Sequence, residues 1–74
     1  MEFNYAILLG RIREFGYTQR KVAEKIGINE GTLSAKLNNQ FAFTVTEMSA
    51  ICKALDITKS EIGVYFFDEK VQKY

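Results

Sequence analysis

The chain has 74 residues, enough for one small domain, and its 47% hydrophobic and 26% charged residues are typical of a globular protein. It has no histidine and a single cysteine, Cys52, which excludes a disulfide framework and a metal site built from several Cys and His ligands. It also lacks an apolar run of about 18 residues and a signal-peptide pattern, so we expect neither membrane insertion nor secretion.

The first expected helix follows Asn4, whose side chain can accept hydrogen bonds from the unpaired amides of a helix N-terminus. Apolar residues then recur every three or four positions, which is the spacing of a buried helical stripe. Gly16 is expected to end this helix. The residues expected on its buried face are Tyr5, Leu8, Leu9, Ile12 and Phe15.

Residues 18–38 predict two short helices joined by a turn. Thr18 can cap the first helix, Gly27 suits the left-handed turn that ends it, and Asn29 can cap the second. The small Ala23 allows the two helices to cross closely, so the segment is predicted to be a helix-turn-helix. The residues expected to be buried here are Val22, Ala23, Ile26, Leu33 and Leu37.

The segment after the helix-turn-helix begins with a polar stop at 38–40 and continues with the aromatic loop 41–43, which we expect under the domain. Thr-x-x-Glu patterns at 44–47 and 58–61 match the capping box and predict the starts of a fourth and a brief fifth helix. The residues expected to face inward from the fourth helix are Met48, Ile51, Cys52 and Leu55.

The tail, residues 62–74, is rich in aromatic and β-branched residues, which predicts a strand or an extended arm. Such apolar surface on a small domain favours an interface, and the alternative is that Phe66 and Phe67 close the core. Both can hold at once. The residues assigned to dimerisation are Ile62, Tyr65, Phe66 and Phe67.

The net charge of +1 is lower than that of most nucleic-acid-binding domains, but its distribution is uneven. Within residues 11–36, six cations face three acids, Glu14, Glu24 and Glu30, so this half has an excess of three positive charges. Beyond residue 46 the balance reverses. The six cations are Arg11, Arg13, Arg20, Lys21, Lys25 and Lys36.

A known family resembles this chain over about residues 4–63. The shared pattern is Thr18-Gln19-x-x-Val22-Ala23-x-x-x-Gly27-Ile28-Asn29-x-x-Thr32-Leu33-Ser34 with Leu37-Asn38. It resembles the phage repressor and Cro (XRE-type) class of helix-turn-helix DNA-binding proteins. The resemblance implies a compact all-α, five-helix, lambda-repressor-like domain over residues 1–74, with the short apolar tail at its end. A chain of this length has no room for the separate C-terminal domain of full-length phage repressors, so it resembles the short Cro type.

The resemblance also implies which residues meet DNA. The base-facing positions of the second helix of the motif match Glu30, Gly31, Thr32, Ser34 and Ala35. The phosphate-contacting positions match Gln19, Arg20, Asn29, Lys36, Asn38 and Asn39. Gly31 and Ala35 have no hydrogen-bonding side chains, and Glu30 points an acid toward a polyanion, so we expect modest sequence specificity. Shape and phosphate contacts are expected to supply a large share of the binding.

The expected function is sequence-specific binding of double-stranded DNA by a small Cro-like transcriptional regulator. We expect a repressor, acting as a homodimer on a near-palindromic operator, without metal, cofactor or small-molecule ligand. The expected location is the cytoplasm, which is that of a bacterial host if the protein is encoded by a phage or prophage. The alternative is a protein-interaction module, like an antirepressor or an antitoxin, on a helix-turn-helix fold that no longer binds DNA. An enzyme is not expected, because the chain lacks histidine and offers no carboxylate pair in a recognisable cleft.

Overall fold

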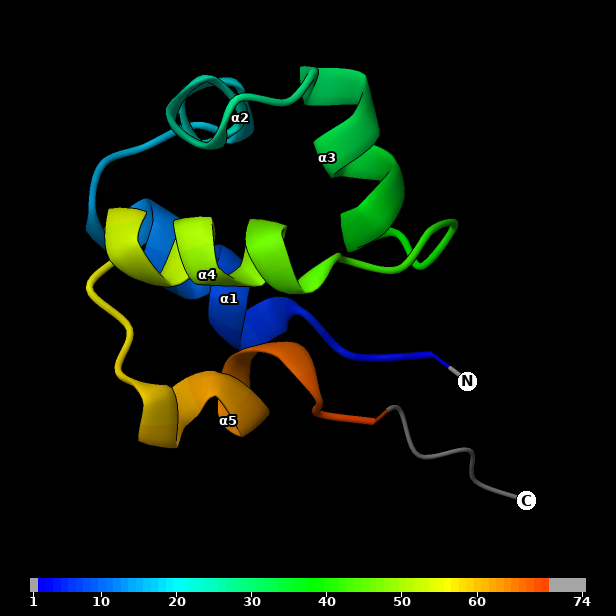
Figure 1. The fold of residues 1–74 in the computed structure, drawn as a ribbon, viewed down its shortest axis with the longest axis vertical. Helices are drawn as coiled ribbons and strands as arrows, with labels where there is room; N and C mark the ends of the chain where they lie inside the picture. Colours follow the sequence, from blue (N-terminus) through cyan, green and yellow to red (C-terminus); the bar gives the residue numbers. More distant parts are fainter. Residues whose placement is uncertain (1, 70–74) are drawn as a thin grey trace.

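A computed structural model describes residues 2–69 and contains five α-helices and one short 3₁₀-helix, with no strand among these residues (Figure 1). The all-α, five-helix fold class is therefore confirmed. The radius of gyration, 11.9 Å, is close to the ~11 Å typical of a compact domain of this length. The elements are α1 (Ala6–Glu14), α2 (Gln19–Ile26), α3 (Glu30–Leu37), α4 (Val45–Ala54), η1 (Lys59–Glu61) and α5 (Ile62–Phe66).

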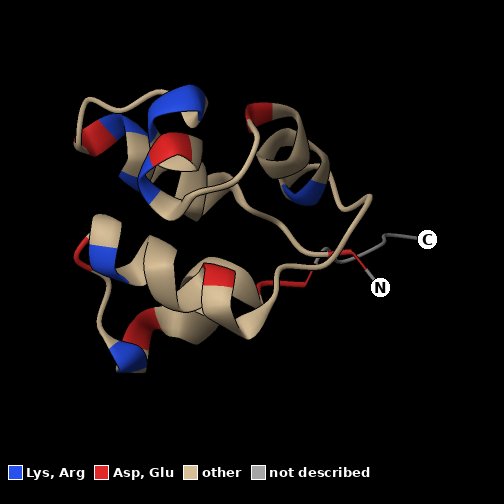
Figure 2. Cartoon of the chain, turned by 45° about the horizontal axis from the view of Figure 1, so that its top comes forward, with Lys and Arg blue, Asp and Glu red and all other residues tan. Residues whose placement is uncertain are grey.

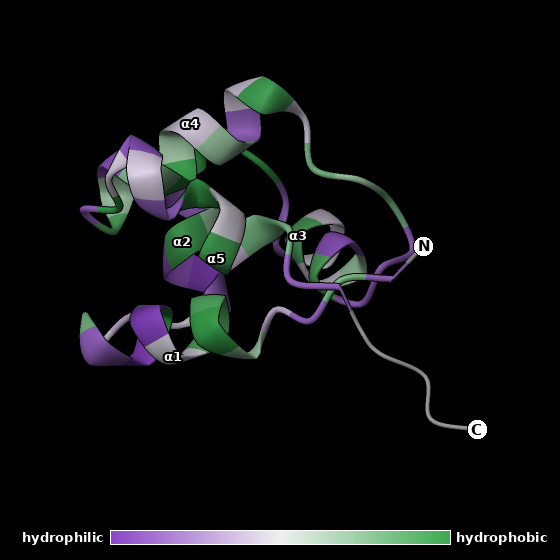
Figure 3. Cartoon of the chain, turned by 90° about the horizontal axis from the view of Figure 1, so that it is seen from below, coloured by the Kyte–Doolittle hydropathy of each residue, from purple (hydrophilic) through white to green (hydrophobic). Residues whose placement is uncertain are grey.

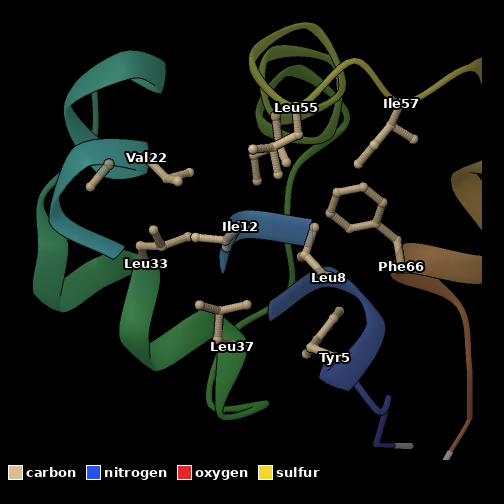
Figure 4. Close-up of a cluster of buried hydrophobic side chains, with 11 residues drawn as sticks. Tyr5, Leu8, Ile12, Val22, Leu33, Leu37, Leu55, Ile57 and Phe66 are labelled. Carbon is tan, nitrogen blue, oxygen red and sulfur yellow. The ribbon is translucent and has the colours of Figure 1, made fainter. Parts of the chain in front are cut away.

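One hydrophobic core joins all five helices (Figure 4). Each helix contributes at least one side chain that is almost fully buried, because each presents a stripe of apolar residues at helical spacing. The largest fully buried side chains are Phe66, Leu8, Leu33, Ile51, Leu55 and Val22.

The helix starts that the sequence predicted are confirmed by their hydrogen bonds. The hydroxyl of Thr18 accepts from the amide of Lys21 at 3.1 Å, and Oδ1 of Asn29 accepts from the amide of Gly31 at 2.7 Å. Thr44 begins α4 with a complete capping box. Gly27 has a φ of +80°, the left-handed turn expected at the end of α2.

The predicted start and buried face of α1 are confirmed except at two residues, Asn4 and Phe15. Asn4 lies one residue before the N-cap, and its Oδ1 accepts from the amide of Ala6 at 2.9 Å. Phe15 is 37% exposed and lies outside the core, so the prediction that it belongs to the buried face is wrong. The centroid of its ring lies 5.0 Å from Cζ of Arg11 and 5.6 Å from the ring centroid of Tyr17.

The structure corrects the prediction that the tail is a strand or an arm. Residues 62–66 form α5, because the capping box of Thr58 and Glu61 starts a helical run that continues through them. Extended pairing is confined, among residues 2–69, to a single antiparallel bridge between Phe3 and Glu69. Residues 70–74 lie outside the described part of the chain.

The two aromatic residues of loop 41–43 differ in burial. Phe43 packs edge-on between Tyr5 and Phe66, with ring centroids 5.4 and 5.5 Å away, as expected of a ring under the domain. Phe41 is 65% exposed, so the same expectation is wrong for it.

No helix in the part of the chain that the structure describes is both long enough and apolar enough to cross a membrane.

Candidate nucleic-acid interface

The second helix of the motif, α3, has a buried face and an outward face. Leu33 and Leu37 are 1% and 9% exposed and hold the helix against the core. Gly31, Ser34, Ala35 and Asn38 follow at the spacing of the opposite face. The residues predicted to face DNA bases all lie on this helix. Glu30, Gly31 and Thr32 are exposed, and Ser34 and Ala35 are partly exposed.

Small side chains dominate this outward face, and one of them has a structural reason to be small. A Cβ atom added to Gly31 would come within 3.0 Å of Oδ1 of Asn29, the atom that caps α3. A side chain at this position would therefore require the Asn29 amide to shift by a few tenths of an ångström. The glycine leaves the cap undisturbed and leaves the first turn of α3 open to a close approach from outside.

Four of the predicted phosphate-contacting residues lie at helix ends or on an exposed surface. Gln19 is the first residue of α2, and Asn29 caps α3. Asn38 ends α3, where its Nδ2 donates to the carbonyl oxygen of Ser34 at 2.8 Å. Arg20 is exposed on α2 and lies 3.7 Å from Oε1 of Glu24, a surface pair that holds the guanidinium only weakly. All four remain compatible with a contact to DNA.

Lys36 does not lie on the outward face, which corrects the prediction of a phosphate contact. Its side chain is 10% exposed, and its Nζ donates to Oε1 of Glu47 at 2.5 Å. The spacing could have revealed this, because Lys36 lies three residues after Leu33 and directly before Leu37, on the edge of the buried face. The lysine connects α3 to the first turn of α4.

The carboxylate of Glu47 makes two contacts that stabilise the start of α4. Besides Lys36, its Oε1 accepts from the amide of Thr44 at 2.8 Å and so completes the capping box of α4. Burial disfavours the charged form and raises the pKa of Glu47, but the hydrogen bonds from Lys36 and Thr44 and the charge of Lys36 outweigh burial. The pKa of Glu47 is lowered as a result.

Asn39 is also engaged inside the molecule. Its Oδ1 accepts from the amide of Phe3 at 2.8 Å and its Nδ2 donates to the carbonyl oxygen of Phe3 at 2.9 Å. Its backbone is left-handed, with a φ of +64°, a conformation that asparagine tolerates better than most residues. The side chain therefore holds the N-terminal segment and is not available for the predicted phosphate contact.

The predicted basic patch is weaker in the structure than in the sequence. Nε of Arg11 donates to the carbonyl oxygen of Leu55 at 2.9 Å, and Nη2 donates to that of Asp56 at 3.2 Å, so this cation caps the C-terminal end of α4. Arg11 and Lys36 both serve tertiary contacts. Of the six cations of residues 11–36, those that remain exposed lie on α1 and α2, while α3 is mostly uncharged (Figure 2).

The other reactive groups among the described residues are the acidic side chains and Cys52. Between residues 2 and 69, no group of three or more Cys, Asp or Glu side chains is placed to hold a metal ion. Cys52 is half-buried beside the core, and burial raises the pKa of its thiol.

Comparison with known proteins gives a family without an assigned activity. No curated protein matches the chain. Residues 1–69 match the family described as "Protein of unknown function (DUF739)", and this chain belongs to that family.

Proposed function

We propose that this protein binds double-stranded DNA by laying α3 in the major groove, as a small Cro-like transcriptional regulator. The observation that carries the proposal is the construction of α3. The helix is capped by Asn29, held from behind by Leu33 and Leu37, and open along its outward face. A capped, exposed second helix of a helix-turn-helix is suited to contacting base edges.

The outward face supports modest sequence recognition. Glu30, Thr32 and Ser34 are the side chains of α3 that can hydrogen-bond to base edges, and the methyl group of Ala35 suits contact with a thymine methyl group. Gly31 and Ala35 add no bidentate contact. A large share of the specificity is therefore assigned to DNA shape and phosphate contacts.

The charge distribution supports a pair of domains on one site. With Lys36 and Arg11 engaged internally, the exposed cations of the motif half are Arg13, Arg20, Lys21 and Lys25. Non-specific binding by so few cations is expected at about 10⁻⁴ to 10⁻⁶ M at physiological salt. Two domains on half-sites about 34 Å apart would raise the occupancy to a useful level. We therefore propose that the regulator acts as a homodimer. From the resemblance to the Cro class we also propose a cytoplasmic repressor, in a bacterial host if the protein is encoded by a phage or prophage.

The proposal is tested by adding one negative charge to the outward face of α3 and, as a control, to another helix. Ala35→Glu is expected to weaken binding to a labelled random-sequence duplex at low salt by tenfold or more, because it adds a carboxylate facing the phosphates, about 1.4 kcal/mol or more. Val64→Glu changes an exposed side chain of α5, a helix on the other side of the core from α3 (Figure 1), and should leave binding within about twofold. Equal losses in both variants would contradict the proposal. Circular dichroism checks that both variants fold.

A second candidate function is supported by the internal engagement of the expected phosphate contacts. Lys36 is paired with Glu47, and both polar atoms of the Asn39 amide bind Phe3. A protein-interaction module on a helix-turn-helix fold would have no need of these groups at its surface. Absence of duplex binding by the wild-type protein, even at low salt, would favour this candidate.

A further inference from the structure

An open groove runs between α4 and α5, on a part of the molecule that the DNA-binding proposal does not use. The two helices run in opposite directions, α4 toward and α5 away from the loop that joins them (Figure 1). The groove has a volume of about 530 Å³. Its lining residues are mostly apolar: Val45, Met48, Ser49, Cys52, Lys53, Asp56, Ile57, Lys59, Ile62 and Phe67.

Large apolar side chains protrude at one end of this groove. Val45 is 79% exposed at the first position of α4, where a polar or acidic residue would be more usual, and Phe67 is 51% exposed just after α5. Phe41, which is 65% exposed, lies on a second, smaller hollow that shares Met48 and Phe67 with the groove. Hydrophobic colour marks the first turn of α4 and α5 in the view from below (Figure 3). Contiguous apolar surface of this kind on a small domain favours an interface.

We propose that a second copy of this chain docks in this groove, through a two-fold contact in which Val45 and Phe67 of each copy enter the groove of the other. A two-fold contact uses the same surface on both copies, so that surface must carry both the protrusion and the hollow that receives it. The α4–α5 face meets this condition, because Val45 and Phe67 flank the groove that they would fill in a second copy.

The charges around the groove also favour a second copy of this chain as its occupant. Lys53 and Lys59 lie at the end where α4 finishes and η1 begins, with Asp56 between them. Asp68 and Glu69 follow Phe67 at the other end. A two-fold axis across the groove would bring the lysine end of one copy to the acidic end of the other.

This assignment keeps part of the predicted interface in the tail and extends it to α4. Ile62 and Phe67, two of the four residues predicted for dimerisation, line the groove. Phe66 is buried in the core and cannot take part. The need for two domains rests on the proposed function, but the surface is assigned from the groove itself and is tested without DNA.

The first test compares two matched substitutions by sedimentation equilibrium over a range of concentrations. Val45→Asp and Ile7→Asp each place an acid in the first turn of a helix, where it favours folding, on a side chain that is exposed in the monomer. Wild-type protein and the Ile7→Asp control should dimerise alike. Val45→Asp should raise the dimer dissociation constant at least about tenfold, because it replaces an apolar side chain by a carboxylate that must lose its hydration in the groove, a cost that the partner's lysines at the end of the groove do not repay.

The second test uses Cys52, the single cysteine of the chain, as a probe inside the groove. The rate of reaction with a thiol reagent should fall as the concentration of wild-type protein rises through the dimerisation range, since the second copy covers the thiol. The rate in Val45→Asp should not change with concentration over the same range.

Three outcomes would overturn the assignment: a wild-type protein that stays monomeric with a concentration-independent Cys52 rate, a Val45→Asp variant that dimerises as wild type does, or equal losses in both variants. Failure of DNA binding would leave these results unaffected. The two proposals can therefore fail separately.

Discussion

The α3 face and the α4–α5 face of this domain are built from the same core but present opposite surfaces. The outward side of α3 exposes small or polar residues such as Gly31 and Ser34, whereas the α4–α5 face exposes Val45 and Phe67 beside an apolar groove. Each helix gives one stripe to the core and leaves the opposite stripe free. A domain of this size can therefore carry a polar surface for a charged partner and an apolar surface for a protein partner at once.

Side chains of the same kind, close together in the sequence, differ in burial in the structure. Phe66 and Phe67 are neighbours, yet one is 1% and the other 51% exposed. Arg20 and Lys36 are both cations of the helix-turn-helix, yet one lies on the surface and the other is enclosed between α3 and α4. Substitutions within these two pairs test whether the paired side chains differ in burial and in role.

The largest effect is expected from Phe66→Ala. This side chain fills the core between Phe43 and the buried residues of α1 and α4, so its loss should cost about 3–5 kcal/mol of the free energy of unfolding. Phe67→Ala should cost less than about 1 kcal/mol in the monomer, because the ring is half exposed. Urea unfolding monitored by circular dichroism measures both. Similar losses in the two variants would mean that the division between core and surface at these positions is wrong.

A smaller effect is expected from Lys36→Met. The substitution leaves the Glu47 carboxylate, whose side chain is 14% exposed, without its cation, which should cost about 2 kcal/mol. The pH dependence gives a second readout. Because the pKa of Glu47 is lowered in the folded state, its contribution is present above its usual value of 4.5 and is lost as the pH falls through the folded-state pKa. Unfolding measured between neutral and acid pH should therefore show a shallower acid loss in the variant. An unchanged acid profile would contradict the pairing.

Asn29→Ala is expected to cost about 1 kcal/mol, since it removes the acceptor for the amide of Gly31 at the start of α3. Thr46→Ala, at an exposed position inside α4, should change stability by less than about 0.5 kcal/mol and serves as the control. Thermal unfolding of the two variants measures both stability changes. A cost for Asn29→Ala no larger than that of the control would show that the cap contributes nothing.

The smallest effect, and the most specific one, is on the salt dependence of DNA binding. Arg20→Met should reduce the slope of log Kobs against log salt by about 0.9, as expected when one phosphate contact is lost. Lys36→Met should leave the slope unchanged, because Lys36 binds Glu47 and not phosphate. Binding to one duplex at several salt concentrations gives both slopes. A reduced slope for Lys36→Met alone would return that lysine to the DNA-contacting surface.

The features predicted correctly from the sequence are local ones. The caps Thr18, Asn29 and Thr44 and the left-handed Gly27 depend on residues within three or four positions, and the buried stripes depend on helical spacing. The five-helix fold follows from these signals taken in order. The prediction of a strand or an arm for the aromatic tail was wrong at residues 62–66. These residues favour β-structure, but they follow directly on the capping box of Thr58, which starts a helix that continues through them.

The features that were missed depend on contacts between distant parts of the chain. Asn39 meets Phe3 across 36 positions, and Arg11 meets Leu55 across 44. No spacing rule brings these residues together, so both were assigned from composition or resemblance. Lys36 is an intermediate case: its place beside Leu37 indicated the buried edge of α3, but its partner Glu47 could be identified only from the packing of α3 on α4.

The most direct test of the central proposal is selection from a random double-stranded DNA pool by the purified protein at about 0.15 M salt, read by sequencing. We expect an enriched near-palindrome whose arms lie about one helical turn, about 34 Å, apart, as required for two copies of α3 in successive major grooves. No enrichment, together with no binding at low salt, would contradict the assignment of α3 as a DNA-reading helix and favour the protein-interaction function.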